Sequence, residues 1–184
     1  MSSQTHATGL TYDDLAAFPD DRLRRELIGG ELIVSPSPQF RHQAVVVVFT
    51  IRLGLYAEEH GGRVLSAPFD VYFDHDSVVQ PDVLYILPEH LHRIEENCLR
   101  GAPDIVIEIS SPSTRRTDLV RKLALYERYG VPEYWYADLK TDTVRVYRLN
   151  NGAYGNPIIL KPGDTLTSPL LPGFAVPVDK LLWP

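Results

Sequence analysis

Two charged side chains occupy positions where the surrounding pattern predicts buried apolar ones. Glu108 interrupts the β-branched run at residues 105–109, which is typical of a strand covered on both faces. Lys122 falls inside the apolar arc of the following helix when residues are placed 100° apart. Because a buried carboxylate and a buried ammonium are each costly alone, we expect them to form an ion pair or to share a metal-bound site.

A second carboxylate can join Glu108 from a neighbouring strand. Asp82 follows Pro81, and a proline inside an apolar strand marks an edge or a bulge that re-aims the next side chain. Asp82 can therefore lie directly beside Glu108, although a solvated strand entry is the alternative. Asp104 repeats the Pro-Asp pair, but it lies about 13 Å from Glu108 along an extended strand. We expect Asp104 in the turn that enters that strand.

Three further polar residues are weaker candidates for the site. Glu31 begins the second strand of a predicted hairpin, where a solubilising edge charge is the simpler explanation. His42 lies in the first turn of a predicted helix. Its side chain is either a ligand at the site or a solvated or locally hydrogen-bonded group. Ser110 shares a strand face with Glu108, but the segment at residues 110–114 lacks the G-x-S-x-G setting of a serine nucleophile. Its hydroxyls are expected to cap turns.

The elements that must position these residues alternate between helix and strand. Glycine pairs, prolines and polar turns separate them. The predicted elements are a helix at 11–17, a hairpin around Gly29-Gly30, a helix at 41–59, strands at 63–73 and 78–87 forming a hairpin around D-H-D-S, a short helix or loop at 88–103, the Glu108 strand, the Lys122 helix ending at Gly130, a hairpin around residues 139–142, and a tail of short strands such as 157–160.

The composition sets limits on the class of protein. A chain of 184 residues without a break in composition predicts one domain, residues 1–184. A single cysteine, Cys98, excludes an internal disulfide framework and fits a reducing compartment. The first ten residues lack a signal-peptide pattern, and the longest apolar run, residues 44–51, is far too short to span a bilayer. We therefore expect a cytoplasmic protein that does not insert into a membrane.

The charge distribution bears on which kind of nucleic-acid-binding protein this chain could be. A net charge of −6 argues against a simple DNA-binding module. It argues less against an enzyme whose site is acidic because it holds metal, provided that a basic patch lies nearby. Residues 111–130 carry five bases and two acids, and such a patch can face a backbone phosphate.

The combination of Asp82, Glu108-Ile109-Ser110 and Lys122 on this order of elements resembles the PD-(D/E)XK nuclease superfamily. Within it, the chain is similar to a bacterial family of restriction-endonuclease-like proteins first catalogued as a domain of unknown function. The resemblance spans about residues 26–149 and is carried by E-L-I-G-G-E-L, R-H-Q, V-V-Q-P-D, P-D-I-V-I-E-I-S-S-P-S-T and R-K-L-A-L-Y-E-R-Y-G-V-P-E-Y-W. The superfamily lysine sits two residues after the second acid. Here Ser110 stands at that position, and the lysine is found at Lys122.

This resemblance implies an α/β (α+β) fold, a restriction-endonuclease-like core with a mixed central β-sheet flanked by helices and with extra N- and C-terminal β-hairpins. It implies a Mg²⁺-dependent endonuclease, with Mn²⁺ as a substitute, that hydrolyses DNA and can form a homodimer. Two carboxylates suit a hard cation, and a lysine can offset charge on phosphate. The implied roles are catalytic for Asp82, Glu108 and Lys122, metal-binding for Asp82 and Glu108, accessory for Glu31, His42 and Ser110, and phosphate-binding for Arg115, Arg116 and Arg121.

A second hypothesis is a catalytically silent nuclease-fold domain that binds nucleic acid or protein partners, because a fold alone does not fix a function. Lys122 separates the two. If it is catalytic, Lys122→Met should keep the fold and abolish cleavage. If it is structural, the same change should strand Glu108 and mainly lower stability.

Overall fold

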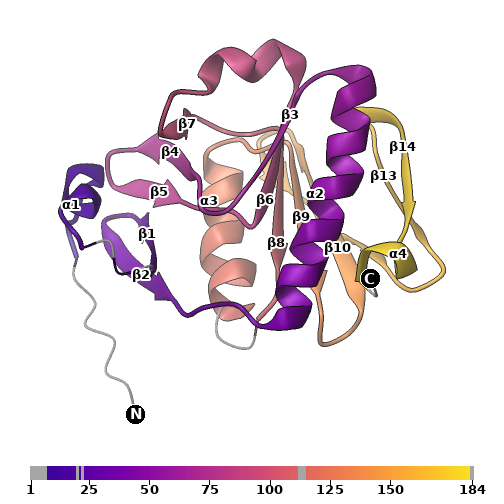
Figure 1. Ribbon diagram of the computed structural model, residues 1–184, viewed down its shortest axis with the longest axis horizontal. Helices are drawn as coiled ribbons and strands as arrows, with labels where there is room; N and C mark the ends of the chain where they lie inside the picture. Colours follow the sequence, from indigo (N-terminus) through magenta and orange to yellow (C-terminus); the bar gives the residue numbers. More distant parts are fainter. Residues whose placement is uncertain (1–7, 20, 22, 112–114, 183–184) are drawn as a thin grey trace.

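The described part of the chain forms two mixed β-sheets that pack against each other, with helices around them (Figure 1). The computed structural model describes residues 8–19, 21, 23–111 and 115–182. The larger sheet of these residues has the order β11-β10-β9-β8-β6-β3, with β12 paired to β10. Only β8 and β9 run parallel in it. Its strands are β3 (Arg63–Ser66), β6 (Val83–Ile86), β8 (Ile105–Ile109), β9 (Glu133–Asp138), β10 (Thr143–Asn150), β11 (Ala153–Tyr154) and β12 (Ile158–Leu160).

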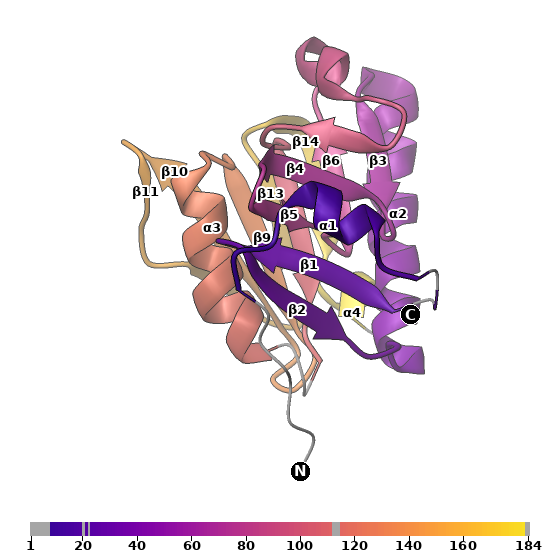
Figure 2. The same ribbon diagram turned by 90° about the vertical axis from the view of Figure 1, so that its left-hand side faces the viewer.

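The smaller sheet has the order β2-β1-β5-β4-β7 and faces the viewer in Figure 2. It consists of β1 (Arg24–Ile28), β2 (Glu31–Ser35), β4 (Asp70–Asp74), β5 (Ser77–Val79) and β7 (Cys98–Arg100). The turn between β1 and β2 places Gly29 and Gly30 at φ values of 59° and 73°, which glycine adopts without strain. The N-terminal hairpin predicted from the glycine pair is present and forms one edge of this smaller, five-stranded sheet.

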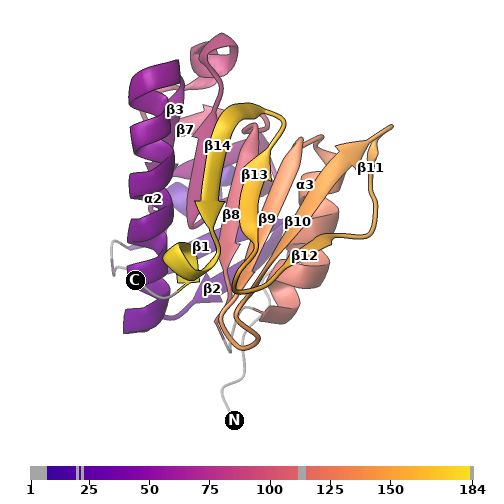
Figure 3. The same ribbon diagram turned by 90° about the vertical axis from the view of Figure 1, so that its right-hand side faces the viewer.

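Helices and a C-terminal hairpin complete the layers. They are α1 (Tyr12–Ala16), α2 (Phe40–His60), the 3₁₀-helix η1 (Pro88–Arg93), the π-helix η2 (Thr117–Lys122), its continuation α3 (Leu123–Arg128), α4 (Asp179–Leu182), and the hairpin of β13 (Thr165–Ser168) and β14 (Leu171–Pro177). Figure 3 shows α2 and the β13–β14 hairpin over one face of the larger sheet. On the other face, α3 and the smaller sheet close the core (Figures 1 and 2).

The side chains of β8 point alternately to the two faces of the larger sheet, and this alternation explains the layers. Ile105, Ile107 and Ile109 belong to one buried cluster with Phe49 of α2, whereas Val106 belongs to a second cluster with residues of α3 and the smaller sheet. All five residues of β8 are buried, as predicted for a strand covered on both faces. Glu108 lies on the same strand face as Val106, because side chains alternate along a strand. The glutamate therefore points into the layer between the two sheets.

The predicted helices at 11–17 and 41–59, and the hairpins around residues 29–30 and 139–142, are confirmed within one or two residues. The prediction of two long strands at 63–73 and 78–87 was wrong. Each splits in two, so that β4 pairs β5 in one sheet while β3 pairs β6 in the other. Pro68 and Pro81 lie at the breaks, and proline cannot donate to a ladder. The chain changes sheet at both points.

The helix that carries Lys122 is not a regular α-helix in its first part. Residues 117–122 form the π-helix, and regular α-helix begins at Leu123. The wheel at 100° per residue is therefore only approximate there, yet Lys122 is 2% exposed, as the wheel predicted. Residues 112–114 of the predicted Ser/Pro turn lie outside the described residues. No helix in the described ranges is long and apolar enough to cross a membrane.

Candidate active site

Asp82 and Glu108 lie side by side on neighbouring strands. Val83 is opposite Ile107 in the antiparallel pair of β6 and β8, so the next pair outward is Asp82 and Glu108. The N–H of Ile109 donates to Asp82 Oδ2 at 2.8 Å, which fixes that carboxylate against β8. Both acids are buried, at 3% and 2% exposure. This is the neighbouring-strand arrangement that the sequence predicted.

Asp104 takes no part in this pair of acids. Its carboxylate accepts the N–H of Leu87 at 2.8 Å and lies 2.8 Å from His90 Nδ1. It therefore stabilises the entry to β8 and the segment after β6, as predicted from its distance from Glu108 along the strand.

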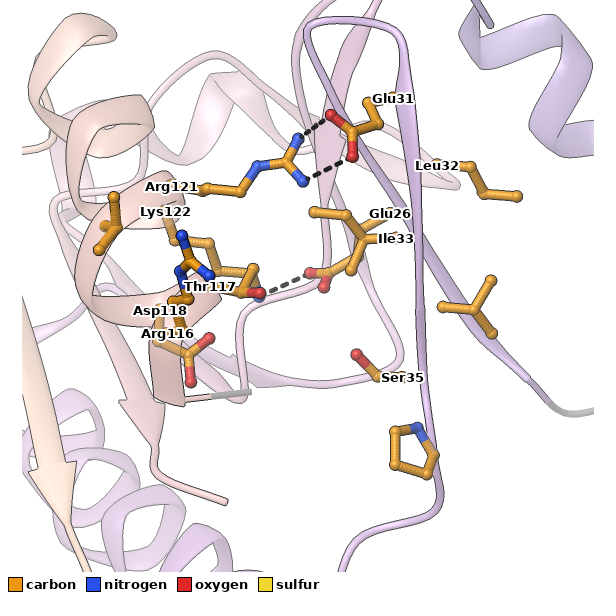
Figure 4. A pocket seen from close by; sticks show the side chains of 13 residues that line it. Glu26, Glu31, Leu32, Ile33, Ser35, Arg116, Thr117, Asp118, Arg121 and Lys122 are labelled. Atoms are coloured by element: carbon orange, nitrogen blue, oxygen red, sulfur yellow. Dashed lines mark hydrogen bonds and ion pairs between the residues drawn. The ribbon is translucent and has the colours of Figure 1, made fainter. Parts of the chain in front are cut away.

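Lys122 joins the two sheets. Its Nζ donates to Glu108 Oε1 at 2.9 Å, from the larger sheet, and to Glu26 Oε1 at 2.8 Å, from β1 of the smaller sheet. Figure 4 shows Lys122 and Glu26 facing each other across the gap between η2 and the hairpin. The Tyr126 hydroxyl donates to the same Glu108 oxygen at 2.6 Å. Two donors therefore hold one oxygen of Glu108, whereas its second oxygen, Oε2, lies 3.8 Å from Arg24 Nη2.

Arg24 of β1 spans the acids from the other side. Its Nη1 donates to Asp82 Oδ1 at 2.7 Å, and its Nη2 lies 3.4 Å from Glu26 Oε1 and 3.8 Å from Glu108 Oε2. Nη2 also donates to the carbonyl of Gln80, whose own N–H donates to Glu26 Oε1 at 2.8 Å. The cluster therefore contains three buried carboxylates and two cationic side chains.

Burial and the neighbouring charges shift the pKa values of the three carboxyls in this cluster in different directions. Burial raises the pKa of Glu108, and neither Lys122 nor Arg24 fully offsets that effect. Burial also acts on Glu26, but there Lys122 and Arg24 prevail and its pKa is lowered. For Asp82, the hydrogen bond from His42 and the charge of Arg24 overcome burial, so that its pKa is lowered strongly. Glu108 is therefore the carboxyl of the three that takes up a proton most easily.

Lys122 keeps its proton in spite of its burial. Burial lowers the pKa of its ammonium, but the charges of Glu108 and Glu26 outweigh burial and the net shift is upward. The pKa of Tyr126 is raised well above its usual value by burial and by Glu108. Both groups consequently act as hydrogen-bond donors to Glu108 at neutral pH.

The accessory candidates divide between two sides of the cluster. His42 Nε2 lies 3.1 Å from Asp82 Oδ2, and His42 Nδ1 is a buried atom without a hydrogen-bond partner among the described residues. Glu31 instead forms two contacts with Arg121, at 3.0 and 2.9 Å. Ser110 accepts the N–H of Leu139 at 2.8 Å. The structure thus brings His42 to the acids, whereas Ser110 fixes the end of β9.

Two cavities flank the cluster, with Ser35 and Pro36 in the walls of both. The first has a volume of about 480 Å³, and Glu26, Glu31, Arg116, Arg121 and Lys122 line it (Figure 4). The second has a volume of about 780 Å³, with Arg24, His42, Gln43, Asp82 and Ser111 among its lining residues. Glu31 and His42 therefore border different cavities.

The arginines predicted to bind phosphate differ in their surroundings. Arg115 Nη1 lies 2.5 Å from Asp138 Oδ1, and Arg121 is held by Glu31. Arg116 is a wall residue of the smaller cavity. The positive charge of two of these three side chains is therefore already balanced by a neighbouring acid.

Sequence reasoning missed Glu26, Arg24 and Tyr126 as members of the cluster. Glu26 follows two arginines and precedes Leu27 in β1, so no apolar run surrounds it as one surrounds Glu108, and no local pattern indicated its burial. Arg24 precedes Glu26 by two residues and thus shares its strand face. Tyr126 gave no separate signal, because a tyrosine in an apolar helix face is usually explained by packing.

Comparison with known proteins places this fold among nuclease-like proteins. The crystal structure of a putative nuclease belonging to DUF820 from Anabaena variabilis ATCC 29413 superposes with a TM-score of 0.79, at 22% sequence identity, over 94% of this chain and 97% of that one. The family model Uma2, described as a putative restriction endonuclease, matches residues 11–179. The chain belongs to this family. None of the curated proteins matches the chain.

The acids of the cluster fit a divalent cation of the Mg²⁺ type in their chemistry. Asp82 and Glu108 supply neighbouring carboxylate oxygens, which such ions prefer, and Mg²⁺ usually retains several waters. No group of three or more His, Cys, Asp or Glu side chains suited to a metal occurs in the part of the chain that the structure describes. Arg24 already places a planar cation across the same two carboxylates. Protein ligands for a metal would therefore be Asp82 and Glu108.

Proposed function

We propose that this protein is a metal-dependent endonuclease that hydrolyses phosphodiester bonds of DNA at Asp82, Glu108 and Lys122. The observation that carries the proposal is the adjacency of two buried carboxylates, with an amine 2.9 Å from one of them. Asp82 lines the 780 Å³ cavity and Lys122 lines the 480 Å³ cavity. Membership in a family described as a putative restriction endonuclease supports it.

The chain's own residues would divide the work as follows. Asp82 and Glu108 would hold Mg²⁺ or Mn²⁺, which supplies Lewis-acid chemistry that activates water and stabilises charge on a phosphate. Lys122 would offset negative charge that develops on the phosphate, and its two acidic partners keep it protonated for that task. Tyr126 and the N–H of Ile109 would hold the two carboxylates in fixed orientations, so that little reorganisation is needed during the reaction.

A DNA cleavage assay tests this function. Supercoiled, linear and single-stranded DNA are incubated with Mg²⁺ or Mn²⁺, and we expect cleavage that is lost in Asp82→Asn and Glu108→Gln. Asp104→Asn is the matched control, because Asp104 has the same preceding proline and similar burial, 2%, but lies outside the cluster. Cleavage that survives both site substitutions, or none with any substrate and metal, would contradict the proposal.

A catalytically silent binding domain is the second candidate. Arg24 favours it, because its guanidinium already neutralises the acids that a nuclease would use for metal. A thermal-shift titration distinguishes the two. The enzyme should gain stability from Mg²⁺ or Mn²⁺ through Asp82, whereas the silent domain should show the same melting temperature with and without metal.

A further inference from the structure

Arg24 occupies the position from which a cation can reach both metal-binding candidates. Its Nη1 is 2.7 Å from Asp82 Oδ1 and its Nη2 is 3.8 Å from Glu108 Oε2. A divalent ion on these two oxygens would need the same space. Because like charges at such short range repel strongly in a buried site, the guanidinium and the metal exclude each other.

Of the two cationic side chains, Arg24 is the one that can leave. Lys122 is 2% exposed and is held by one acid from each sheet. Arg24 has 24% side-chain exposure and is a wall residue of the 780 Å³ cavity. If its long side chain rotated into that cavity, the ion pairs by which Lys122 joins the two sheets would stay intact. The cavity therefore offers the displaced guanidinium a place beside Asp82.

The guanidinium also retains unused capacity for hydrogen bonds. Arg24 Nε is a buried atom without a hydrogen-bond partner among the described residues. The donors of a guanidinium match the oxygens of phosphate in pairs, and a phosphate in this cavity would lie next to Asp82. The chemistry of the side chain and the position of the cavity thus indicate the same ligand.

We propose that Arg24 is an internal counter-ion that metal displaces from Asp82 and Glu108, and that the displaced guanidinium then binds a phosphate of the substrate. This inference rests on the proposed function. It gives Arg24 two successive partners, the acids before metal enters and the phosphate afterwards. Without metal, Arg24 limits the excess of buried negative charge. With metal bound, the released guanidinium provides a contact to DNA.

Metal binding without DNA tests the first half. Mn²⁺ is titrated into the wild type, Arg24→Gln and Arg24→Lys by calorimetry, with a thermal melt of each protein to verify folding. We expect Arg24→Gln to bind Mn²⁺ about tenfold more tightly, within the range of ordinary coupling between sites, and Arg24→Lys to fall between. Arg25→Gln is the matched control, since Arg25 is the next residue on β1 but pairs with Asp21 at 2.6 Å. Its Mn²⁺ affinity should equal that of the wild type.

DNA binding tests the second half. The affinity for a labelled duplex is measured as a function of salt, with EDTA and with Ca²⁺, and cleavage is monitored in the same samples. With EDTA, wild type and Arg24→Gln should have equal salt dependence, because Arg24 is held by the acids. With Ca²⁺, the slope of log affinity against log salt should be smaller in magnitude by about 1 for Arg24→Gln, the loss of one phosphate contact.

The outcomes separate this inference from the proposed function. Wild-type protein that binds Mn²⁺ through Asp82, together with an unchanged or weaker affinity in folded Arg24→Gln, overturns the displacement while leaving the nuclease intact. Equal salt slopes with Ca²⁺ overturn the phosphate contact. Absence of Mn²⁺ binding in every variant overturns both the inference and the metal-dependent function.

Discussion

Replacing Lys122 by methionine should destabilise the protein whether or not the lysine takes part in catalysis. From the sequence alone, an unchanged fold was the expectation for a catalytic lysine. The structure changes that expectation, because Nζ is bound to two buried carboxylates, at 2.8 and 2.9 Å. Methionine fills the space of the stem but leaves Glu26 and Glu108 without their shared ammonium.

The size of the effect follows from this burial. Lys122 and both acids are 1–2% exposed, so little solvent screening reduces the interaction, and breaking a buried pair costs about 3–5 kcal/mol. For a chain of 184 residues, each kcal/mol lowers the melting temperature by about 2–4 °C. We therefore expect Lys122→Met to melt roughly 6–20 °C below the wild type at neutral pH.

The loss should depend on pH in a defined direction. Without the ammonium, burial raises the pKa of the two stranded carboxyls above their unfolded values, near 4.3. Such groups stabilise the fold below the unfolded pKa, and that contribution disappears as the pH rises through the folded pKa. The deficit of Lys122→Met should accordingly be smallest near pH 4 and grow toward pH 8.

Urea unfolding at several pH values, followed by circular dichroism, measures this free energy. Lys180→Met serves as the control, because Lys180 is an exposed lysine on α4 and its loss should change stability by no more than about 0.5 kcal/mol. Adding Glu26→Gln to Lys122→Met should recover part of the loss, since one stranded charge is removed. If Lys122→Met unfolds at the same urea concentration as the wild type at pH 8, the assignment of a buried ion-pair network is wrong.

Three other changes probe the same region by measurement of unfolding free energy in urea. Tyr126→Phe removes one donor from Glu108 and should cost about 1.5–3 kcal/mol, the usual range for a hydrogen bond to a charged group; an unaltered midpoint would contradict the contact. Asp82→Asn should be destabilising at pH 7, and its difference from the wild type should shrink as the pH falls below about 4, because a lowered folded pKa stabilises only above the unfolded value. Glu31→Gln should cost only about 0.2–1 kcal/mol, since its pair with Arg121 is about one third exposed; a larger loss would reveal a role beyond that ion pair.

The sequence predicted the parts of the fold that depend on local signals. The glycine pair fixed the β1–β2 turn, and the apolar run with one acid in it predicted β8 and its burial on both faces. The division of the strands around Pro68 and Pro81 was not predicted, because a proline excludes a ladder hydrogen bond but does not say which sheet the chain joins next. That choice depends on packing between distant segments.

The same distinction applies to the site. Asp82, Glu108 and Lys122 could be brought together from strand register and a helix face, which are periodic properties. Arg24 could not be placed in this way, because its long side chain reaches the acids from another sheet. No local sequence pattern predicts how the two sheets pack against each other. Arg121, a phosphate-binding candidate, is paired with Glu31, again across two elements that only the tertiary fold makes neighbours.

The hydrogen bond between Lys122 and Glu26 joins residues 96 positions apart in the chain. During synthesis, Glu26 emerges long before the lysine that balances it, and until η2 has been made its carboxylate can pair, among the described residues, only with Arg24 and the N–H of Gln80. Contacts of such long range tend to form slowly. A chain interrupted before Lys122 can therefore hold both Asp82 and Glu108 and still lack the amine beside them, so that completion of the site coincides with arrival of the segment that joins the two sheets.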